Sequence, residues 1–528
     1  MNELYTVAEI RQIEQAALAG LPAGTLMQRA GAAAMQMALA MLDNASIASA
    51  PRVLVLAGPG NNGGDALDVA ARLAQAGIEV TVALYAVAER QPQDARAALG
   101  RAQAGAATLL APGDPGDSAA PSAAGSIYQR HWDLVIDGLF GIGLARPLAG
   151  AMRAMVEFIN TLPCQVLALD IPSGLDADTG DIVGPGGIAV RAHRTITFIA
   201  DKPGLHTCHG RDHAGQVSIA TLDIDPALLP PAQAFLNGPI LFADALRPRP
   251  QNSHKGSFGD VAVLGGAHGM QGAPILAARA ALHCGAGRVF ACFVDEAPGY
   301  DPAQPELMCR HAGDFDFSKT TVVAGPGSGG ASRANELLAR VLDLPVPLVL
   351  DADALNLVAA DRALQQRLAA RTGATILTPH PLEAARLLAV SAGVIQADRL
   401  AAARQLAARF QAIVILKGSG SVIARPDGSV AINPSGNPAL ATAGTGDVLA
   451  GVCGALLAQH LPPWQAALSA AWLHGHAADR LVEAGVGPVG LSASELIPAI
   501  RTALNALNAL CTLGALGALG AQITVNAH

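Results

Sequence analysis

The sequence is poor in aromatic and charged residues. Aromatic side chains make up 3% and charged ones 14% of its 528 residues, whereas 51% are hydrophobic. The apolar share comes largely from Ala, Leu, Val and Ile, a composition that suits helices packed on parallel strands. Because a chain of this length is too long to fold around a single hydrophobic core, we expect two or three domains.

The sequence lacks features that several functional classes of protein require. There is no basic stripe with interleaved aromatics and the net charge is −8, so we expect no nucleic-acid partner. No apolar run reaches the roughly 18 residues of a membrane span, so we expect no membrane insertion. Residues 1–11 carry charges and no apolar core, which argues against a signal peptide.

The seven cysteines form no Cys-x-x-Cys pair and are scattered along the chain. An odd number without a framework indicates a reducing compartment, so we expect a cytoplasmic protein. The P-loop pattern Gly-x-x-x-x-Gly-Lys-Ser/Thr is also missing, which excludes P-loop phosphate binding.

What the sequence does contain is strand–helix alternation, in two blocks. This alternation predicts parallel sheets covered by helices. The strands predicted in the first block are 53–57, 80–84, 134–137, 166–170, 195–198 and 216–219. Those predicted in the second block are 261–264, 289–293, 321–324, 348–351, 375–377, 413–416 and 422–424.

Composition also predicts the domain bounds. The first domain spans 1–224, and a proline-rich linker with one short element spans 225–250. The second domain spans 251–503, and a low-complexity tail spans 504–528.

The most informative stretch, 437–451, places two glycines and a carboxylate at the start of a helix. Gly444 and Gly446 allow the backbone to turn tightly beside a ligand. The apolar run from Val448 predicts a helix whose first N–H groups face that turn, an arrangement that binds phosphate. Asp447 either caps this helix or takes a proton from a bound hydroxyl.

The first block carries a second glycine motif. Gly58, Gly60 and Gly63 follow the strand 53–57 and satisfy Gly-x-Gly-x-x-Gly. An ordinary dinucleotide fold also places an acid at the end of the next strand, whereas the nearest acid here is Glu89. The neighbouring asparagines instead favour a cation or a ribose.

Polar side chains follow two further strands of this block. Asp137 ends one strand, Asp170 ends the next, and Ser173 follows it. Carboxyl ends of parallel strands are where such sheets bind ligands. Oxygen atoms of Asn62, Asp137 and Ser173 are therefore candidate ligands of a hard cation.

Four motifs together make residues 1–222 resemble the NAD(P)H-hydrate epimerase domain. They are Gly-Pro-Gly-Asn-Asn-Gly-Gly-Asp at 58–65, Asp-Gly-Leu-Phe-Gly-Ile-Gly-Leu at 137–144, Asp-Ile-Pro-Ser-Gly-Leu-Asp at 170–176 and Asp-Lys-Pro-Gly at 201–204. The resemblance implies that Asn62, Asp137 and Ser173 bind K⁺. It implies that the hydrated nucleotide contacts Asn61, Asn62, Gly63, Gly64, Asp65, Gly141, Ile142, Gly143, Leu144, Ala145, Arg146, Pro147 and Asp170.

The chain departs from that family at Ala66, where glycine is usual, and at Gln28-Arg29, where an acid or asparagine is frequent. Ala66 is expected to narrow the adjoining loop. We further hypothesise that Asp137 and Lys202 form the acid–base pair that inverts C6 of the substrate. Alternatively, Lys202 only neutralises a phosphate.

The second block resembles the ADP- or ATP-dependent NAD(P)H-hydrate dehydratases of the ribokinase-like superfamily, over residues 243–503. The motifs are Gly-Gly-Ala-His at 265–268, Gly-Pro-Gly-Ser-Gly at 325–329, Thr-Pro-His-Pro-Leu-Glu at 378–383, Lys-Gly-Ser-Gly-Ser at 417–421, and the Gly-Thr-Gly-Asp helix start. The hydrated nucleotide is then expected to contact Ala273, Gly327, His380 and Asp447. ADP or ATP, with Mg²⁺, is expected to contact Lys417, Gly418, Ser419, Gly420, Ser421, Asn437, Ala443, Gly444, Thr445 and Gly446.

Plainer interpretations of this block stay open. His380 is otherwise a hydrogen-bonded loop histidine and Lys417 a solvated charge, and Leu382 stands where the family commonly has glycine. Asp447 would act as the base while a phosphoryl group moves onto the C6 hydroxyl, with the amides of 444–446 stabilising its charge.

Together the two resemblances imply an α/β protein of two doubly wound domains. The first is a Rossmann-like three-layer sandwich and the second is ribokinase-like. The implied function is bifunctional repair: epimerisation of R and S hydrated NADH and NADPH, and dehydration of the S form at the expense of ADP or ATP, with ADP favoured. We expect a homo-oligomer. The alternatives are a ribokinase-like small-molecule kinase and an N-terminal half that binds nucleotide without catalysis.

Overall fold

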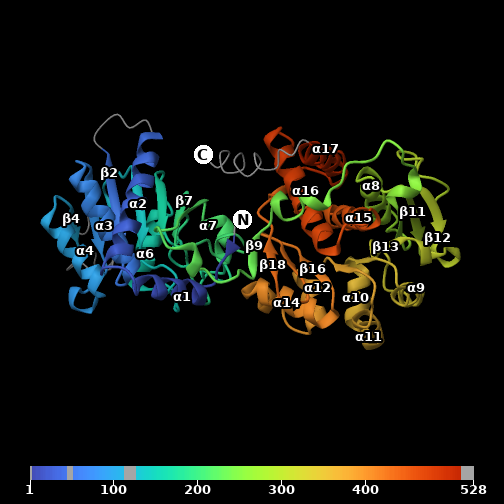
Figure 1. The fold of residues 1–528 in the computed structure, drawn as a ribbon, viewed down its shortest axis with the longest axis horizontal. Helices are drawn as coiled ribbons and strands as arrows, with labels where there is room; N and C mark the ends of the chain where they lie inside the picture. Colours follow the sequence, from blue (N-terminus) through green and yellow to red (C-terminus); the bar gives the residue numbers. More distant parts are fainter. Residues whose placement is uncertain (1–2, 45–50, 112–125, 513–528) are drawn as a thin grey trace. The chain divides into compact units, whose positions relative to one another are not determined.

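The computed structural model describes residues 3–44, 51–111 and 126–512. The chain divides into two compact units between Gln233 and Ala234 (Figure 1). Each unit is an α/β sandwich, so the predicted fold class is confirmed.

The first unit is built on a parallel sheet of order β4-β3-β2-β5-β6-β7-β8. Its strands are β2 Arg52–Ala57, β3 Glu79–Leu84, β4 Thr108–Leu110, β5 Leu134–Gly138, β6 Gln165–Leu169, β7 Arg194–Phe198 and β8 Gln216–Ala220. The strand order reverses between β2 and β5. In such sheets the ligand crevice lies at this reversal, beyond the carboxyl ends of the two strands.

Helices cover both faces of this sheet. They are α1 Val7–Leu18, α2 Thr25–Asn44, α3 Asn61–Gln75, α4 Gln93–Ala104, α6 Gly150–Ile159 and the short α7 Gly210–His213. Alternate residues of β2 face opposite sides. Val53 and Val55 pack with α1–α4, while Leu54 and Leu56 pack with α6. The three layers follow from this alternation of buried side chains.

The second unit is built on a larger sheet that contains the order β9-β18-β17-β16-β15-β14-β13-β10-β11-β12. Strands β10 to β16 pair in parallel, and the hairpin β17–β18 extends the sheet antiparallel. The bounds are β9 Ala234–Leu236, β10 Asp260–Gly265, β11 Arg288–Phe293, β12 Met308–His311, β13 Thr321–Ala324, β14 Leu348–Leu350, β15 Thr375–Leu377, β16 Ile413–Leu416, β17 Val422–Ala424 and β18 Val430–Ile432.

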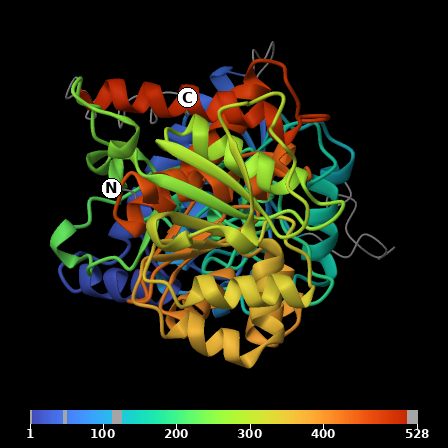
Figure 2. The same ribbon diagram turned by 90° about the vertical axis from the view of Figure 1, so that its right-hand side faces the viewer.

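Two groups of helices cover this second sheet. One group is α9 Ser332–Leu342, α10 Ala352–Ala360, α11 Arg362–Ala369, α12 Pro381–Leu388, α13 Ala392–Ala397 and α14 Arg399–Phe410. The other is α8 Gly272–His283, α15 Thr445–Ala458, α16 Pro463–Glu483 and α17 Ala493–Thr512. Figure 2 shows the yellow and orange helices on one side of the strands and the red helices on the other.

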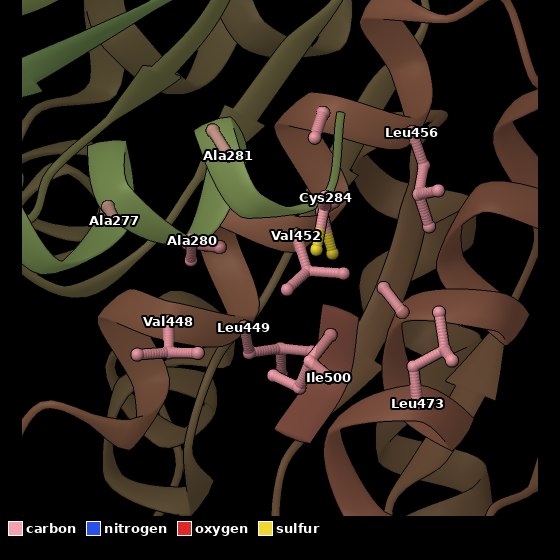
Figure 3. Packing of buried hydrophobic residues seen from close by; sticks show 14 of the residues in the cluster. Ala277, Ala280, Ala281, Cys284, Val448, Leu449, Val452, Leu456, Leu473 and Ile500 are labelled. Atoms are coloured by element: carbon pink, nitrogen blue, oxygen red, sulfur yellow. The ribbon is translucent and has the colours of Figure 1, made fainter. Parts of the chain in front are cut away.

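Small residues let α8 and α15 approach closely in the core of this unit. Ala277, Ala280 and Ala281 of α8 face Val448 and Val452 of α15 (Figure 3). A Cβ placed on Gly451 of α15 would lie 2.1 Å from the Ala277 carbonyl oxygen. The contact therefore requires glycine at position 451, and it fixes the start of α15 relative to α8.

The unit bounds differ from those predicted by composition. Strand β9 lies within the predicted linker and pairs with β18 of the second unit. Helix α17 continues past residue 503, and its Leu504 and Leu507 belong to the buried core. Ile500, Leu504 and Leu507 recur at helical spacing, which explains why these residues pack rather than form a tail. The rest of the predicted tail, 513–528, lies outside the described residues.

The described helices include none that is long and apolar enough to cross a membrane.

Candidate functional site

A cavity of about 480 Å³ opens at the strand reversal of the first unit. Many residues predicted to contact a nucleotide line it: Asn61, Asn62, Asp65, Gly141, Ile142, Gly143 and Asp170. Arg11 and Glu14 of α1 also line it. The sequence did not indicate them, because α1 lies far from the glycine motifs along the chain.

Other residues of the predicted epimerase site have different surroundings. Asn61 to Asp65 form the first turn of α3 rather than a loop. Gly63 and Gly64 are buried: a Cβ on Gly63 would lie 1.9 Å from the Gly58 carbonyl oxygen. These glycines therefore serve close packing of helix and strand. Leu144, Ala145, Arg146 and Pro147 do not line the cavity either.

The expectation that Ala66 narrows the adjoining loop is also not met. The residue is completely buried, and a Cβ on Gly138 would lie 2.5 Å from the Ala66 Cβ. Ala66 therefore packs beneath β5 instead of narrowing the cavity.

Asp170 joins the cavity to a buried ion pair. Its backbone has φ 66°, an uncommon conformation for a non-glycine residue. Its Oδ1 lies 2.8 Å from Nζ of Lys202. That ammonium also donates to Thr197 Oγ1 and to two backbone carbonyls, and Lys202 has no exposed surface. Lys202 thus holds the Asp170 carboxylate in place from within the protein, and it is too deeply buried to contact a phosphate.

The predicted pairing of Asp137 with Lys202 is not found. Asp137 is fully buried and accepts hydrogen bonds from the Ser173 hydroxyl (2.7 Å), the Ser173 N–H (2.8 Å) and the Leu139 N–H. Burial raises the pKa of Asp137 to about 6, against the opposing effect of the Ser173 hydrogen bonds. Neither Asp137 nor Lys202 lines the cavity, because both side chains are enclosed beneath it.

The three predicted cation ligands surround one strand end. Asp137 and Ser173 are hydrogen bonded, and the backbone carbonyl oxygen of Asn62 lies 2.9 Å from a Cβ built on Gly138, the residue that follows Asp137. The amide nitrogen of Asn62 donates to the Leu169 carbonyl, but its Oδ1 is buried without a hydrogen-bond partner. A buried oxygen without a donor is suited to a cation.

Asp65 completes the charge pattern of this cavity. Burial raises its pKa well above the usual aspartate value, and the negative charges of Asp170, Asp68 and Glu14 raise it further. The cavity thus contains a carboxyl with a raised pKa, Asp65, near a second carboxyl, Asp170, that is ion-paired with Lys202. A carboxyl whose pKa is raised by burial in a ligand cavity is typical of a general acid.

In the second unit, the partly exposed Lys417 and the buried Asp351 form an ion pair. Lys417 Nζ lies 2.6 Å from Asp351 Oδ1, which also accepts a hydrogen bond from the Thr378 hydroxyl at 2.8 Å. Burial lowers the pKa of Lys417, but Asp351 and Glu383 outweigh this effect and hold the pKa above its usual value. Lys417 is therefore a fixed charge and not a solvated one.

This pair lies against the start of α15. A Cβ on Gly446 would be 3.3 Å from Lys417 Nζ and 3.7 Å from Asp351 Oδ2. The helix is preceded by Gly444, with φ 89°, and its first N–H groups have no intrahelical partner. The lysine and the bare amides thus converge on one point, as an anion site requires.

Asp447 is the third residue of α15 and not its cap, since Gly444 occupies the capping position without a side-chain bond. Burial, followed by the nearby Asp351 charge, raises the pKa of Asp447 to about 7. A carboxylate with this pKa is a competent base near neutral pH. Of the two roles that the sequence left open, the structure excludes the cap.

The remaining predicted contacts adjoin this cluster. A Cβ on Gly327, where φ is 59°, would lie 3.2 Å from the Ala273 Cβ, so the two residues are neighbours at the β10–β13 reversal. His380 caps α12: its Nδ1 accepts from the N–H groups of Leu382 and Glu383. Burial and the charge of Lys417 lower the pKa of His380, which favours the neutral imidazole.

The turn after β16 is open enough to receive a ligand. Gly418 and Ser419 are exposed, and Gly418 and Gly420 have φ of 146° and 60°. Arg399 supports this turn from inside by donating to the carbonyls of Leu416 and Lys417. Ala443 is exposed at the second predicted nucleotide-binding segment, whereas the Asn437 amide donates to Asp479.

Comparison with known proteins assigns each unit. Residues 261–501 match a family model described as NAD(P)H-hydrate dehydratase, and residues 23–204 match one described as the YjeF-related protein N-terminus. The bifunctional NAD(P)H-hydrate repair enzyme Nnr of Coxiella burnetii is 36% identical over 96% of this chain and its own whole length. The Escherichia coli enzyme of the same name is 38% identical, over 93% of this chain and 92% of its own length. The chain belongs to the bifunctional NAD(P)H-hydrate repair enzymes.

A solved structure of an ADP/ATP-dependent NAD(P)H-hydrate dehydratase from Bacillus subtilis is also similar. It is 31% identical, covers 50% of this chain and 95% of its own, and has a TM-score of 0.44. In the chain described here, the family match over residues 23–204 includes most of the residues that line the cavity at the β2–β5 reversal. The match over residues 261–501 includes the Lys417–Asp351 pair and Asp447. The predicted bifunctional enzyme is thereby confirmed.

Proposed function

We propose that the Lys417–Asp351 cluster transfers a phosphoryl group from ADP or ATP to the C6 hydroxyl of S-hydrated NAD(P)H. The observation that carries this proposal is the convergence of Lys417, the first amides of α15 and Asp447 at one point. Lys417 and the amides hold the transferring phosphoryl group, and Asp447 takes the proton of the attacking hydroxyl. Loss of phosphate from C6 and of a proton from C5 then restores the double bond.

The two substrates would enter from different sides of this point. The exposed turn 418–421 and the segment 441–446 accept the adenine nucleotide. Ala273, Gly327 and His380 accept the hydrated nicotinamide nucleotide. Mg²⁺ suits this place, since it needs one or two carboxylates in addition to substrate phosphates. Asp353, whose charge interacts with that of Asp447, is the candidate carboxylate for Mg²⁺.

In the cavity of the first unit, we propose Asp65 and Asp170 as the acid–base pair for epimerisation. Protonated Asp65 donates to the C6 hydroxyl, which leaves as water with the electron pair of the broken C–O bond. The ring nitrogen stabilises the resulting cation. Water then adds to the opposite face while Asp170 takes its proton. Proton exchange with solvent returns Asp170 to its carboxylate and Asp65 to its acid form, so atoms and charge balance over the cycle. Nζ of Lys202 lies 2.8 Å from Asp170 Oδ1.

We further propose that Asn62, Asp137 and Ser173 hold K⁺. The buried, unpartnered Oδ1 of Asn62 fits such an ion, and the hydrogen-bonded carboxylate of Asp137 and hydroxyl of Ser173 offer further oxygen ligands. The ion would fix the turn that carries Gly141 at the rim of the cavity. The enzyme is also proposed to be a cytoplasmic homo-oligomer.

Two variants separate the half-reactions. Asp447→Asn should epimerise the hydrated nucleotide normally but return no NADH, because it lacks the base for phosphoryl transfer. Asp170→Asn should return NADH from the S epimer alone. Chiral chromatography of the remaining hydrate, with NADH absorbance, measures both. Undiminished NADH return by Asp447→Asn would refute the base assignment, and normal epimerisation by Asp170→Asn would refute the cavity assignment.

A further inference from the structure

Three side chains that commonly bind metals meet on two loops of the first unit. Asp181, Cys208 and His209 each bring one donor atom within 4.8 Å of the other two. Nε2 of His209 lies 3.7 Å from Oδ1 of Asp181. Among the residues that the structure describes, no other three His, Cys, Asp or Glu side chains meet this closely.

The donor set indicates the kind of ion. Thiolate and imidazole are ligands of zinc and similar transition ions, whereas K⁺ and Mg²⁺ prefer oxygen alone. Around tetrahedral zinc, with bonds of about 2.0–2.3 Å, neighbouring donor atoms stand roughly 3.3–3.6 Å apart. The observed separation of 3.7 Å is close to this range. Small rotations of exposed side chains would complete the geometry, since the side chains of His209 and Asp181 are 52% and 37% exposed.

The two loops that carry these donors are already joined. The Gly210 N–H donates to the Gly180 carbonyl at 3.1 Å, and the Gly204 N–H donates to the Ala177 carbonyl at 2.8 Å. A Cβ on Gly180 would lie 2.3 Å from the Thr207 carbonyl oxygen, so the backbones are in contact. The site is thus held by backbone contacts that do not depend on the ion, and binding would require little reorganisation.

We propose that Asp181, Cys208 and His209 form a zinc-binding site, with water as the fourth ligand. The site is separate from both catalytic assignments, because none of its residues lines the cavity or belongs to the Lys417 cluster. Its role is to clamp the loop that follows Lys202 to the loop that follows Asp170. The proposal is independent of the proposed function.

Zinc binding is tested on the full chain without an affinity tag, after treatment with a chelator and its removal. Zinc chloride is titrated in competition with a chromophoric chelator, in the presence of excess Mg²⁺ and K⁺. The wild-type chain should bind one zinc. Losing an outer-shell partner weakens a metal site about 10- to 100-fold, so losing an inner ligand in Cys208→Ser, His209→Gln or Asp181→Asn should weaken it by about 100-fold or more.

Control variants distinguish this site from scattered binding. His131→Gln removes an exposed histidine beside Asp133, and Cys309→Ser removes a half-buried thiol elsewhere. Both should bind zinc like the wild type. Cobalt should give a thiolate charge-transfer absorption in the wild type but not in Cys208→Ser, and thermal melting without metal checks that each variant folds. If the wild type fails to compete with the chelator, or all three ligand variants bind as the wild type does, the proposal is wrong.

Discussion

The Nζ atom of Lys417 lies 2.6 Å from Oδ1 of Asp351, a residue 66 positions earlier in the chain. This pair links the carboxyl end of β14 to the turn after β16 and places a fixed positive charge beside Gly446. The negative charge of Asp351 also raises the pKa of Asp447. One buried carboxylate therefore positions Lys417, the proposed phosphate-binding residue, and raises the pKa of Asp447, the proposed base.

The pH dependence of dehydration should reflect this arrangement. Asp447 must be ionised to accept a proton, so the dehydration kcat should rise with pH through about 7 and level off above it. Removing the charge of Asp351 in Asp351→Asn removes a repulsion that raises this pKa. The rising limb should then move to lower pH. Single-turnover rates measured across the pH range provide the test.

Asp351→Asn should also lower kcat and stability, because Lys417 loses its charged partner. Breaking a buried ion pair costs about 3–5 kcal/mol, and we expect the low end because Lys417 is partly exposed. Thr378→Val removes an uncharged donor to Asp351 and to the Leu350 carbonyl but leaves the charge of Asp351, so the pH profile should stay in place. If the rising part of the pH–rate profile shifted as far in Thr378→Val as in Asp351→Asn, the electrostatic explanation would be contradicted.

Lys202 should be more important for folding than for substrate contact. Lys202→Met leaves the Asp170 carboxylate without its cation, and the unfolding free energy of the first unit should fall by about 3–5 kcal/mol. The double variant Lys202→Met with Asp170→Asn removes both charges and should recover part of that loss. Urea unfolding measures this difference. Full stability of the single variant would show that the pair contributes little.

Epimerisation should depend on K⁺ through the oxygens near Asn62. We expect the epimerisation rate of the wild type to rise with K⁺ and to respond weakly to Na⁺ at equal ionic strength. Ser173→Ala removes one proposed ligand and should shift the K⁺ response to higher concentration. Dehydration of purified S epimer, measured in the same samples, serves as the control. An epimerisation rate independent of K⁺ in the wild type would exclude the proposed site.

The close contact of α8 and α15 gives a prediction about packing. Gly451→Ala would push a methyl group against the Ala277 carbonyl and should destabilise the second unit by about 1–3 kcal/mol. Gly393→Ala, on the exposed face of α13, should change stability by less than about 1 kcal/mol. Denaturant midpoints of the two variants test this, and equal midpoints would mean that the helices separate without cost.

The sequence was sufficient for the strands and for the glycine turns that follow them. β-Branched runs and glycine motifs are local signals, so β2, β5, β10 and β13 were predicted close to their observed bounds. Strand β12 was missed because it carries no β-branched residue. Strand β18 was also missed, although two of its three residues are β-branched. Asp351 was predicted only as the end of a strand, and no role was predicted for Glu14.

These omissions have one physical cause. The role of Asp351 depends on a lysine 66 residues away. The raised pKa of Asp65 depends on burial and on the charges of Asp170, which follows β6, of Asp68 and of Glu14 in α1. Such effects arise only when the chain has folded, so no local sequence pattern predicts them. The same holds for Asp137 and Lys202, whose enclosure beneath the cavity is a matter of packing.

The most direct test of the whole account uses chemically hydrated NADH that contains both epimers. The protein is supplied with Mg²⁺, K⁺ and either ADP or ATP, and the return of NADH absorbance is followed to completion. The account predicts full recovery, with the faster nucleotide identifying the preferred phosphoryl donor. Recovery that stops at the share of the S epimer would contradict epimerisation by the first unit, and no recovery would contradict dehydration by the second.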